Sequence, residues 1–199
     1  MKRNILLVLS IVLAISAYSQ NKKISQAMVD KILNVPVYLY SYPNQEYEET
    51  GTISATWSAI ASGLDESVGI SERTKELINK AKNKKKKGKV SDFNAIIINP
   101  DDYTATLILL SDKSSLNAVV KRVSGVPVYI YSYPIEEYEE VKEISATWSV
   151  LGGSNSLKDR VSELISKAKR KEKKGKIGQF DAIIISPDDF TGILIKFKE

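Results

Sequence analysis

The stretch Val35-Pro-Val-Tyr-Leu-Tyr-Ser-Tyr-Pro43 returns almost unchanged as Val126-Pro-Val-Tyr-Ile-Tyr-Ser-Tyr-Pro134. Two further stretches also recur: Ile53–Ser58 returns as Ile144–Ser149, and Phe93–Ile98 returns as Phe180–Ile185 with one change. Repetition at this spacing predicts a tandem duplication, in which two copies of one small α+β unit pack on each other as a pseudo-dimer. We place the first repeat, with its leading segment, at residues 20–112 and the second at residues 113–199.

Working outward from Val126 in the second copy, the pattern predicts a strand over residues 126–133, with Tyr129, Tyr131 and Tyr133 on one face. An acidic turn, residues 136–140, follows, and alternating apolar residues then predict a second strand over residues 141–148. Because the two segments are close in sequence, we expect them to form a hairpin.

A helix follows in each copy. Val161, Leu164, Ile165 and Ala168 have the spacing of one helical face, and Ser156 is a suitable N-cap. The first copy repeats the face, and each helix ends in lysines and a glycine, which suit the helix dipole and a left-handed C-cap. The equivalent residues of the first copy are Thr74, Leu77, Ile78 and Ala81, with Gly88 for Gly175.

Residues 180–186 and 191–198 predict two more strands joined by the turn Pro187-Asp-Asp-Phe190, so the predicted unit is ββαββ. The segment before it, residues 116–123, fits either a short helix or a strand leading into a tight turn. Both faces of the last strands are apolar, and one helix covers only one face. We therefore expect the other copy to cover the second face, sheet against sheet or edge to edge.

The N-terminus has the composition of a cleaved signal peptide, residues 1–19: Lys2 and Arg3 precede an apolar run that ends before Ala17-Tyr18-Ser19. Lys2 and Arg3 leave with the signal, so the net charge of +5 falls to +3 in the mature chain. This predicts a secreted or periplasmic protein with no stable membrane span in the mature form and no nucleic-acid partner.

The chain contains no Cys and no His. This composition excludes disulfides, a Ser-His-Asp triad, a Cys nucleophile and His-ligated metal sites. We therefore expect no catalytic residues, no metal and no cofactor. A hydrolase that uses Asp or Glu is the remaining enzymatic alternative, but no pair of acids stands out.

Tyrosines that alternate along the repeated strand are one candidate site. They could form a stacking platform for glycan or peptide, because a tyrosine has a flat apolar face and a polar tip. The alternative, which we favour, is that the rings pack between the copies. The residues are Tyr38, Tyr40, Tyr42, Tyr129, Tyr131 and Tyr133.

The lysine runs at the helix ends are a second candidate, because they could bind an anionic polymer or a membrane surface; the simpler interpretation is a solvated helix end that faces the acidic turns. This basic patch comprises Lys84, Lys85, Lys86, Lys87, Lys171, Lys173 and Lys174. The pairs Asp101-Asp102 and Asp188-Asp189 most simply serve their turns, since calcium needs six or more oxygen ligands. Trp57 and Trp148 are expected in the core.

The order of elements, with a helix leading into Phe180-Asp181-Ala182-Ile183-Ile184, resembles uncharacterised exported proteins of Gram-negative bacteria and, more distantly, YbjQ-like domains. The latter resemblance implies an α+β, oligomerising domain described as a metal binder. It brings no functional residue to this chain, which has no His or Cys to hold a heavy metal.

Taken together, these features predict an exported, non-enzymatic binding or assembly module of the cell envelope. Its partner would be an envelope protein or an anionic or glycan polymer, and the chain could itself form a homo-oligomer. A carbohydrate- or peptide-binding protein that uses the tyrosines is the alternative function.

Overall fold

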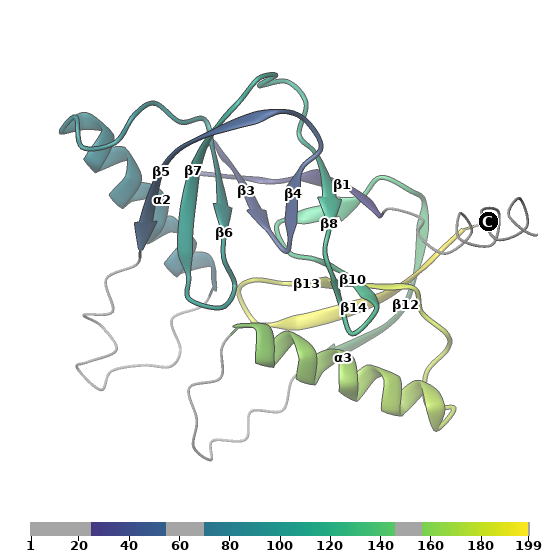
Figure 1. Ribbon diagram of the computed structural model, residues 1–199. Coiled ribbons are helices and arrows are strands. Elements are labelled where there is room, and N and C mark those ends of the chain that lie inside the picture. Colours follow the sequence, from purple (N-terminus) through teal and green to yellow (C-terminus); the bar gives the residue numbers. More distant parts are fainter. Residues whose placement is uncertain (1–24, 55–69, 146–156, 199) are drawn as a thin grey trace, which may run out of the picture.

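The computed structural model describes residues 25–54, 70–145 and 157–198. It is an α+β structure in which two five-stranded mixed sheets, each with one helix, are joined by a third sheet of four strands (Figure 1). The predicted signal peptide, Trp57, Trp148 and the N-cap Ser156 lie outside the described residues. We call residues 25–110 the first half and residues 117–198 the second half.

The two five-stranded sheets have the same internal order. In each, a short hairpin strand pairs with the strand that begins Val-Pro, which runs parallel to the Ala-Ile-Ile-Ile strand; two antiparallel strands complete the sheet. The first sheet is β2 (Lys31–Ile32), β3 (Val35–Leu39), β6 (Ala95–Ile98), β7 (Thr104–Leu110) and β5 (Tyr47–Ser54). The second is β9 (Arg122–Val123), β10 (Val126–Tyr129), β13 (Ala182–Ile185), β14 (Thr191–Phe197) and β12 (Tyr138–Ser145).

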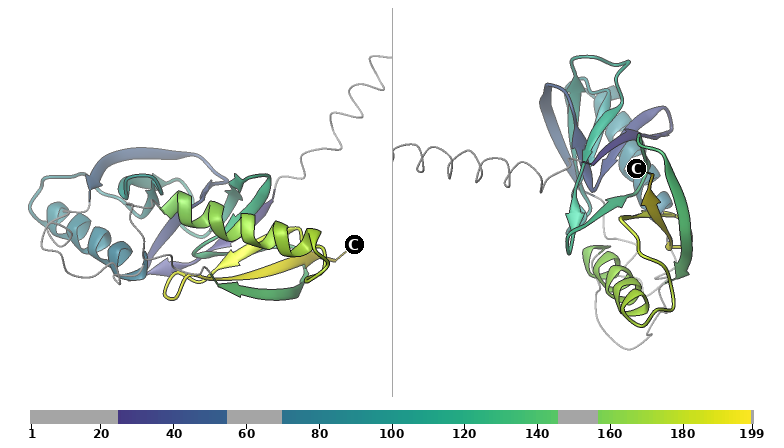
Figure 2. Two further views of the ribbon diagram at one scale, coloured as in Figure 1. Left: turned by 90° about the horizontal axis from the view of Figure 1, so that it is seen from below. Right: turned by 90° about the vertical axis from the view of Figure 1, so that its right-hand side faces the viewer.

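Each helix lies along its own sheet, and the two helices run apart toward opposite ends of the molecule (Figure 2). Helices α2 (Ile70–Lys86) and α3 (Leu157–Lys173) bury the predicted stripes, including Leu77 and Leu164. Each ends as predicted: Gly88 and Gly175 have positive φ, and the amide of the following lysine donates to the carbonyl five residues back, at 2.9 Å in both cases. These bonds satisfy carbonyls that a helix end otherwise leaves without partners.

The third sheet interleaves strands of the two halves in the order β11 (Ser132–Pro134), β1 (Gln26–Val29), β8 (Asn117–Val120) and β4 (Ser41–Pro43). Ala27 pairs with Ala118 at its centre. Ala27 also pairs with Pro134, and Ala118 pairs with Pro43. The pairing is therefore the same when viewed from either half. β1 of the first half lies between two strands of the second half, and β8 of the second half lies between two strands of the first.

The inner face of the third sheet covers the faces of the five-stranded sheets that the helices leave open. One buried cluster, which we call the shared cluster, draws on all three sheets. The two-sided burial expected from the sequence is therefore present, but the second face is covered by a third sheet with strands from both halves, which the sequence did not predict. Its buried members are Tyr38, Ala95, Ile108 and Leu110 of the first sheet, Tyr129, Ala182 and Ile195 of the second, and Ala27, Val29, Ala118 and Val120 of the third.

Two predictions about local structure need correction, and one alternative that the sequence left open is resolved. The predicted hairpin between the first two strands is wrong, because β12 pairs with β14 and β5 pairs with β7. The predicted ββαββ unit describes each half incompletely, because each half has additional short strands. The leading segment forms strands β8 and β9 with a tight turn at Ser124-Gly125, where both residues have positive φ, as a two-residue hairpin of this type requires.

The predicted continuous strand over residues 126–133 is interrupted at Tyr131. Tyr131 and its counterpart Tyr40 adopt φ values of 54° and 58°, which non-glycine residues seldom do. Each kink is held by the other half: Asp30 N–H donates to the Tyr131 carbonyl at 2.8 Å, and Lys121 N–H donates to the Tyr40 carbonyl at 2.7 Å. The kink directs the chain out of the five-stranded sheet and into the third sheet.

Candidate functional site

The six tyrosines of the repeated strand occupy three different environments, because the kink breaks their alternation. Tyr38 and Tyr129 are fully buried in the shared cluster, and burial raises the pKa of each to about 12. Both are therefore inaccessible to a ligand, in keeping with the packing role that we favoured for the stripe.

Tyr40 and Tyr131 are also buried, but on the helix side, in a second cluster with both helices. There the Tyr131 hydroxyl faces Thr74 and Ser71 of α2. Burial raises the pKa of Tyr40, and the carboxylates of Asp101 and of Asp159 on α3 raise it further. Tyr103 joins them, with the Arg73 guanidinium 5.6 Å from its ring centroid. No hydrogen bond of ordinary geometry reaches the buried hydroxyls of Tyr40, Tyr103, Tyr131 and Thr74. Thr74 nevertheless lies near enough to Tyr103 and Tyr131 to lower the pKa of each against the larger effect of burial.

Tyr42 and Tyr133 alone remain exposed, and they lie on the outer face of the third sheet. Alternation along β1 and β8 turns Gln26, Met28, Asn117 and Val119 to the same side. Met28 is the direct neighbour of Tyr133, and Val119 is the direct neighbour of Tyr42. We call this surface the outer face: Gln26, Met28, Asp30, Tyr42, Asn117, Val119, Lys121 and Tyr133.

The outer face gathers exposed apolar surface. Met28, Tyr42, Tyr133 and the adjacent Ile135 are four of the six large hydrophobic side chains that are strongly exposed in the described part of the chain. Single exposed apolar residues are common, but adjacent ones indicate an interaction surface. Tyrosine and methionine are also among the residues enriched at protein interfaces.

The two ends of the outer face carry opposite charges. Lys121 Nζ lies 4.2 Å from the ring centroid of Tyr42, a cation–π contact. Asp30 occupies the position in the first half that Lys121 occupies in the second. Burial raises the pKa of Tyr133, and the nearby Asp30 carboxylate raises it further.

Tyr42 and Tyr133 were predicted from the sequence as site residues, but Met28, Val119 and the two charged residues were not. The sequence Gln26-Ala-Met-Val29 does contain a signal for the outer face. In an alternating strand Met28 falls on the same side as Gln26, where a polar residue would be expected. Recognising it requires knowing that β1 is a strand with one face open to solvent.

The lysine runs do not form one patch, because the C-terminal ends of α2 and α3 point to opposite ends of the molecule (Figure 1). Lys86, Lys87, Lys173 and Lys174 are exposed. Lys85 pairs with Asp92 at 3.0 Å, in the loop after its own helix and not in an acidic turn.

The aspartate pairs serve their turns. Asp102 Oδ1 accepts hydrogen bonds from the amide and hydroxyl of Thr104, and Asp189 Oδ1 does the same with Thr191. These bonds hold the pKa of Asp102 below its usual range. The pKa of Asp189 is lowered first by a hydrogen bond from Ser186 and then by those from Thr191. Within the described ranges, no three His, Cys, Asp or Glu side chains are placed to hold a metal ion.

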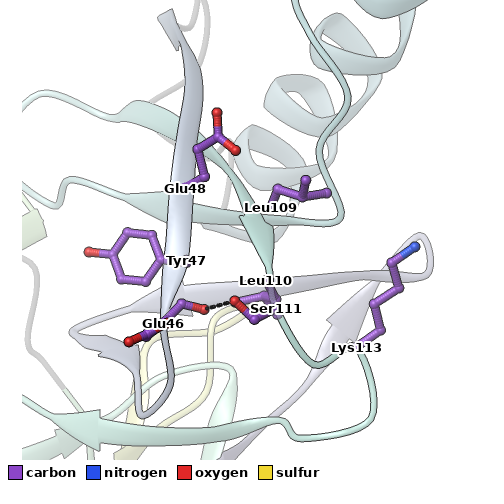
Figure 3. A pocket seen from close by; sticks show the side chains of 7 residues that line it. All are labelled: Glu46, Tyr47, Glu48, Leu109, Leu110, Ser111 and Lys113. Atoms are coloured by element: carbon purple, nitrogen blue, oxygen red, sulfur yellow. Dashed lines mark hydrogen bonds between the residues drawn. The ribbon is translucent and has the colours of Figure 1, made fainter.

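A shallow pocket of about 470 Å³ lies where β5 begins and β7 ends (Figure 3). Two of its lining residues are joined by a hydrogen bond of 3.0 Å from the Ser111 hydroxyl to the Glu46 carbonyl. Figure 3 shows the side chains of Glu46, Glu48 and Lys113 pointing away from one another, so they do not converge on one bound group.

The chain matches no model of a known protein family, and no curated protein or solved structure shows significant similarity to it. Across the ranges that the structure describes, no helix is both long enough and apolar enough to cross a membrane.

Proposed function

We propose that this protein is an exported, non-enzymatic binding or assembly module of the bacterial cell envelope, and that it binds its protein partner through the outer face. The observation that carries the proposal is the gathering of Met28, Tyr42 and Tyr133 on the solvent side of a sheet whose other side is core. The signal-like N-terminus and the absence of Cys and His support export and a non-enzymatic role.

We further propose that the two halves are copies of one duplicated unit, packed as a pseudo-dimer. The repeated sequence segments and the matching registers of the third sheet support this origin. In this view the outer face was created by the duplication, because it consists of strands from both halves.

The proposal can be tested with reporter thiols, because the chain has no cysteine of its own. Met28→Cys places the reporter on the outer face, and Asn79→Cys places a matched reporter on the exposed side of α2. We expect maleimide to label Met28→Cys several-fold more slowly in the intact envelope than in dilute purified protein, whereas Asn79→Cys reacts equally in both. Equal rates for Met28→Cys in the two settings would overturn the proposal, and N-terminal sequencing of the mature chain tests export.

A further inference from the structure

The outer face carries an arrangement of charge that selects its partner. Ala27 pairs with Ala118, so the β1 and β8 strands run in opposite directions from this central pair. Asp30 lies at one end of the face and Lys121 at the other, roughly 20 Å apart at about 3.4 Å per residue. The apolar residues Met28 and Val119 lie between them.

We infer that the occupant of the outer face is a second copy of this chain, docked face to face about a twofold axis that lies between the faces and perpendicular to the strands. This rotation reverses the strand direction, so Asp30 of one copy faces the partner's Lys121, and the contact occurs twice. Complementary charge of this kind fixes orientation and excludes the alternative axis along the strands, which would bring the two Asp30 carboxylates together. The inference rests on the proposed function, because it names the partner of the same surface.

The size of the face sets the expected strength. The four strands of the third sheet are three or four residues long. At about 4.8 Å between strands and about 3.4 Å per residue they present roughly 230 Å² per copy, well below the roughly 800 Å² per partner of a typical stable interface. The dimer should therefore be weak, concentration-dependent and sensitive to salt, since the charged residues lie at its solvent-exposed rim.

Charge reversal tests the arrangement directly. Sedimentation velocity of the purified full-length protein over a range of concentrations should show a monomer–dimer equilibrium at low salt that weakens as salt is raised. Asp30→Lys alone and Lys121→Asp alone should each weaken dimerisation about tenfold or more, because like charges then face each other twice. The double variant Asp30→Lys/Lys121→Asp should restore it to near the wild-type level, and circular dichroism of each variant verifies the fold.

A protein that stays monomeric at every concentration and salt level would overturn the inference. So would a dimer whose strength is unchanged by the single charge reversals, or a double variant that dimerises as weakly as the single variants. The two proposals fail separately. If the purified protein is monomeric while Met28→Cys is still protected in the envelope, the partner is another protein and only the self-association is wrong. If the purified protein dimerises while Met28→Cys labels in the envelope as fast as in dilute solution, the proposed function fails.

Discussion

The two halves share the same backbone fold but differ in the side chains that are buried next to their helices. Where the first half has Thr74 and Tyr103, the second has Val161 and Phe190 in the corresponding positions. All four are buried, and Tyr103 and Phe190 share a positive φ of 56° and 57°. The second half shows that the fold accepts apolar side chains there, so the partnerless hydroxyls of the first half are not required for folding.

The halves also differ at the ends of the third sheet, where Asp30 corresponds to Lys121. The backbone of each makes the same hydrogen bond to a kinked tyrosine, so the side chains are free to diverge without loss of the fold. The interleaved backbone is therefore common to both halves, whereas charge and polarity distinguish them.

The largest expected effect comes from separating the halves. Residues 113–199 expressed alone should form a homodimer in which Ala118 pairs with the partner's Ala118, because the pairing in the third sheet reads the same from either half. Light scattering measures the mass. A stable monomer would show that the second half does not need its counterpart to cover Tyr129, Ala182 and Ile195.

Placing a charge at the centre of the third sheet should nearly abolish folding. Ala27 is fully buried, so Ala27→Asp should lower the free energy of unfolding by about 4 kcal/mol, and Ala118→Asp should do the same. Gln26→Asp on the exposed face is the control and should change it by less than about 0.5 kcal/mol. Urea denaturation measures all three, and clearly unequal losses for the two alanines would break the equivalence of the halves.

Alkaline pH should destabilise the protein through the tyrosines that both halves bury. Burial raises the pKa of Tyr38 and Tyr129 to about 12, whereas tyrosines in the unfolded chain titrate near 10. Between pH 10 and 12 the unfolded state releases protons that the folded state retains, so stability falls as pH rises, by up to about 1.4 kcal/mol per pH unit for each tyrosine. Tyr129→Phe should reduce this slope in urea midpoints, and a slope unchanged by that variant would refute the assignment.

Making the first half resemble the second should stabilise it. Thr74→Val and Tyr103→Phe each remove a buried hydroxyl that makes no hydrogen bond of ordinary geometry, so each should raise the free energy of unfolding by about 1 kcal/mol. The reverse change, Val161→Thr, should lower it by a similar amount. Thermal unfolding that shows Thr74→Val to be destabilising would mean that the hydroxyl is bonded after all.

A smaller effect is expected where Gly192 corresponds to Ala105. A Cβ at Gly192 would lie 2.6 Å from Ile183 Cδ1 and 2.9 Å from Leu164 Cδ2, and both side chains are fully buried. Gly192→Ala should therefore cost about 1 kcal/mol through overpacking, even though Ala105 is accommodated in the first half. Calorimetry that shows Gly192→Ala to be stabilising would mean that the two cores adjust equally well.

The helices, their buried stripes, their glycine caps and the β13–β14 pairing could be read from the sequence because each depends on residues close together in the chain. The strand that begins at Val126 could be read only up to Tyr129, since nothing local signals the positive φ of Tyr131. That conformation is held by a hydrogen bond from Asp30, a hundred residues away in the other half. The outer face was missed for the same reason, because its residues meet only through pairings between the halves.

By itself, the sequence determined that the chain repeats, that each helix buries one stripe and that the central strands are apolar on both sides. These are properties of side-chain spacing, which acts within a few residues. The tertiary structure alone decided what covers the second side of those strands, which tyrosines remain in solvent and where the opposite charges of Asp30 and Lys121 lie. Those outcomes follow from strand pairing between distant segments, whose register is set by how the whole apolar surface can be buried at once.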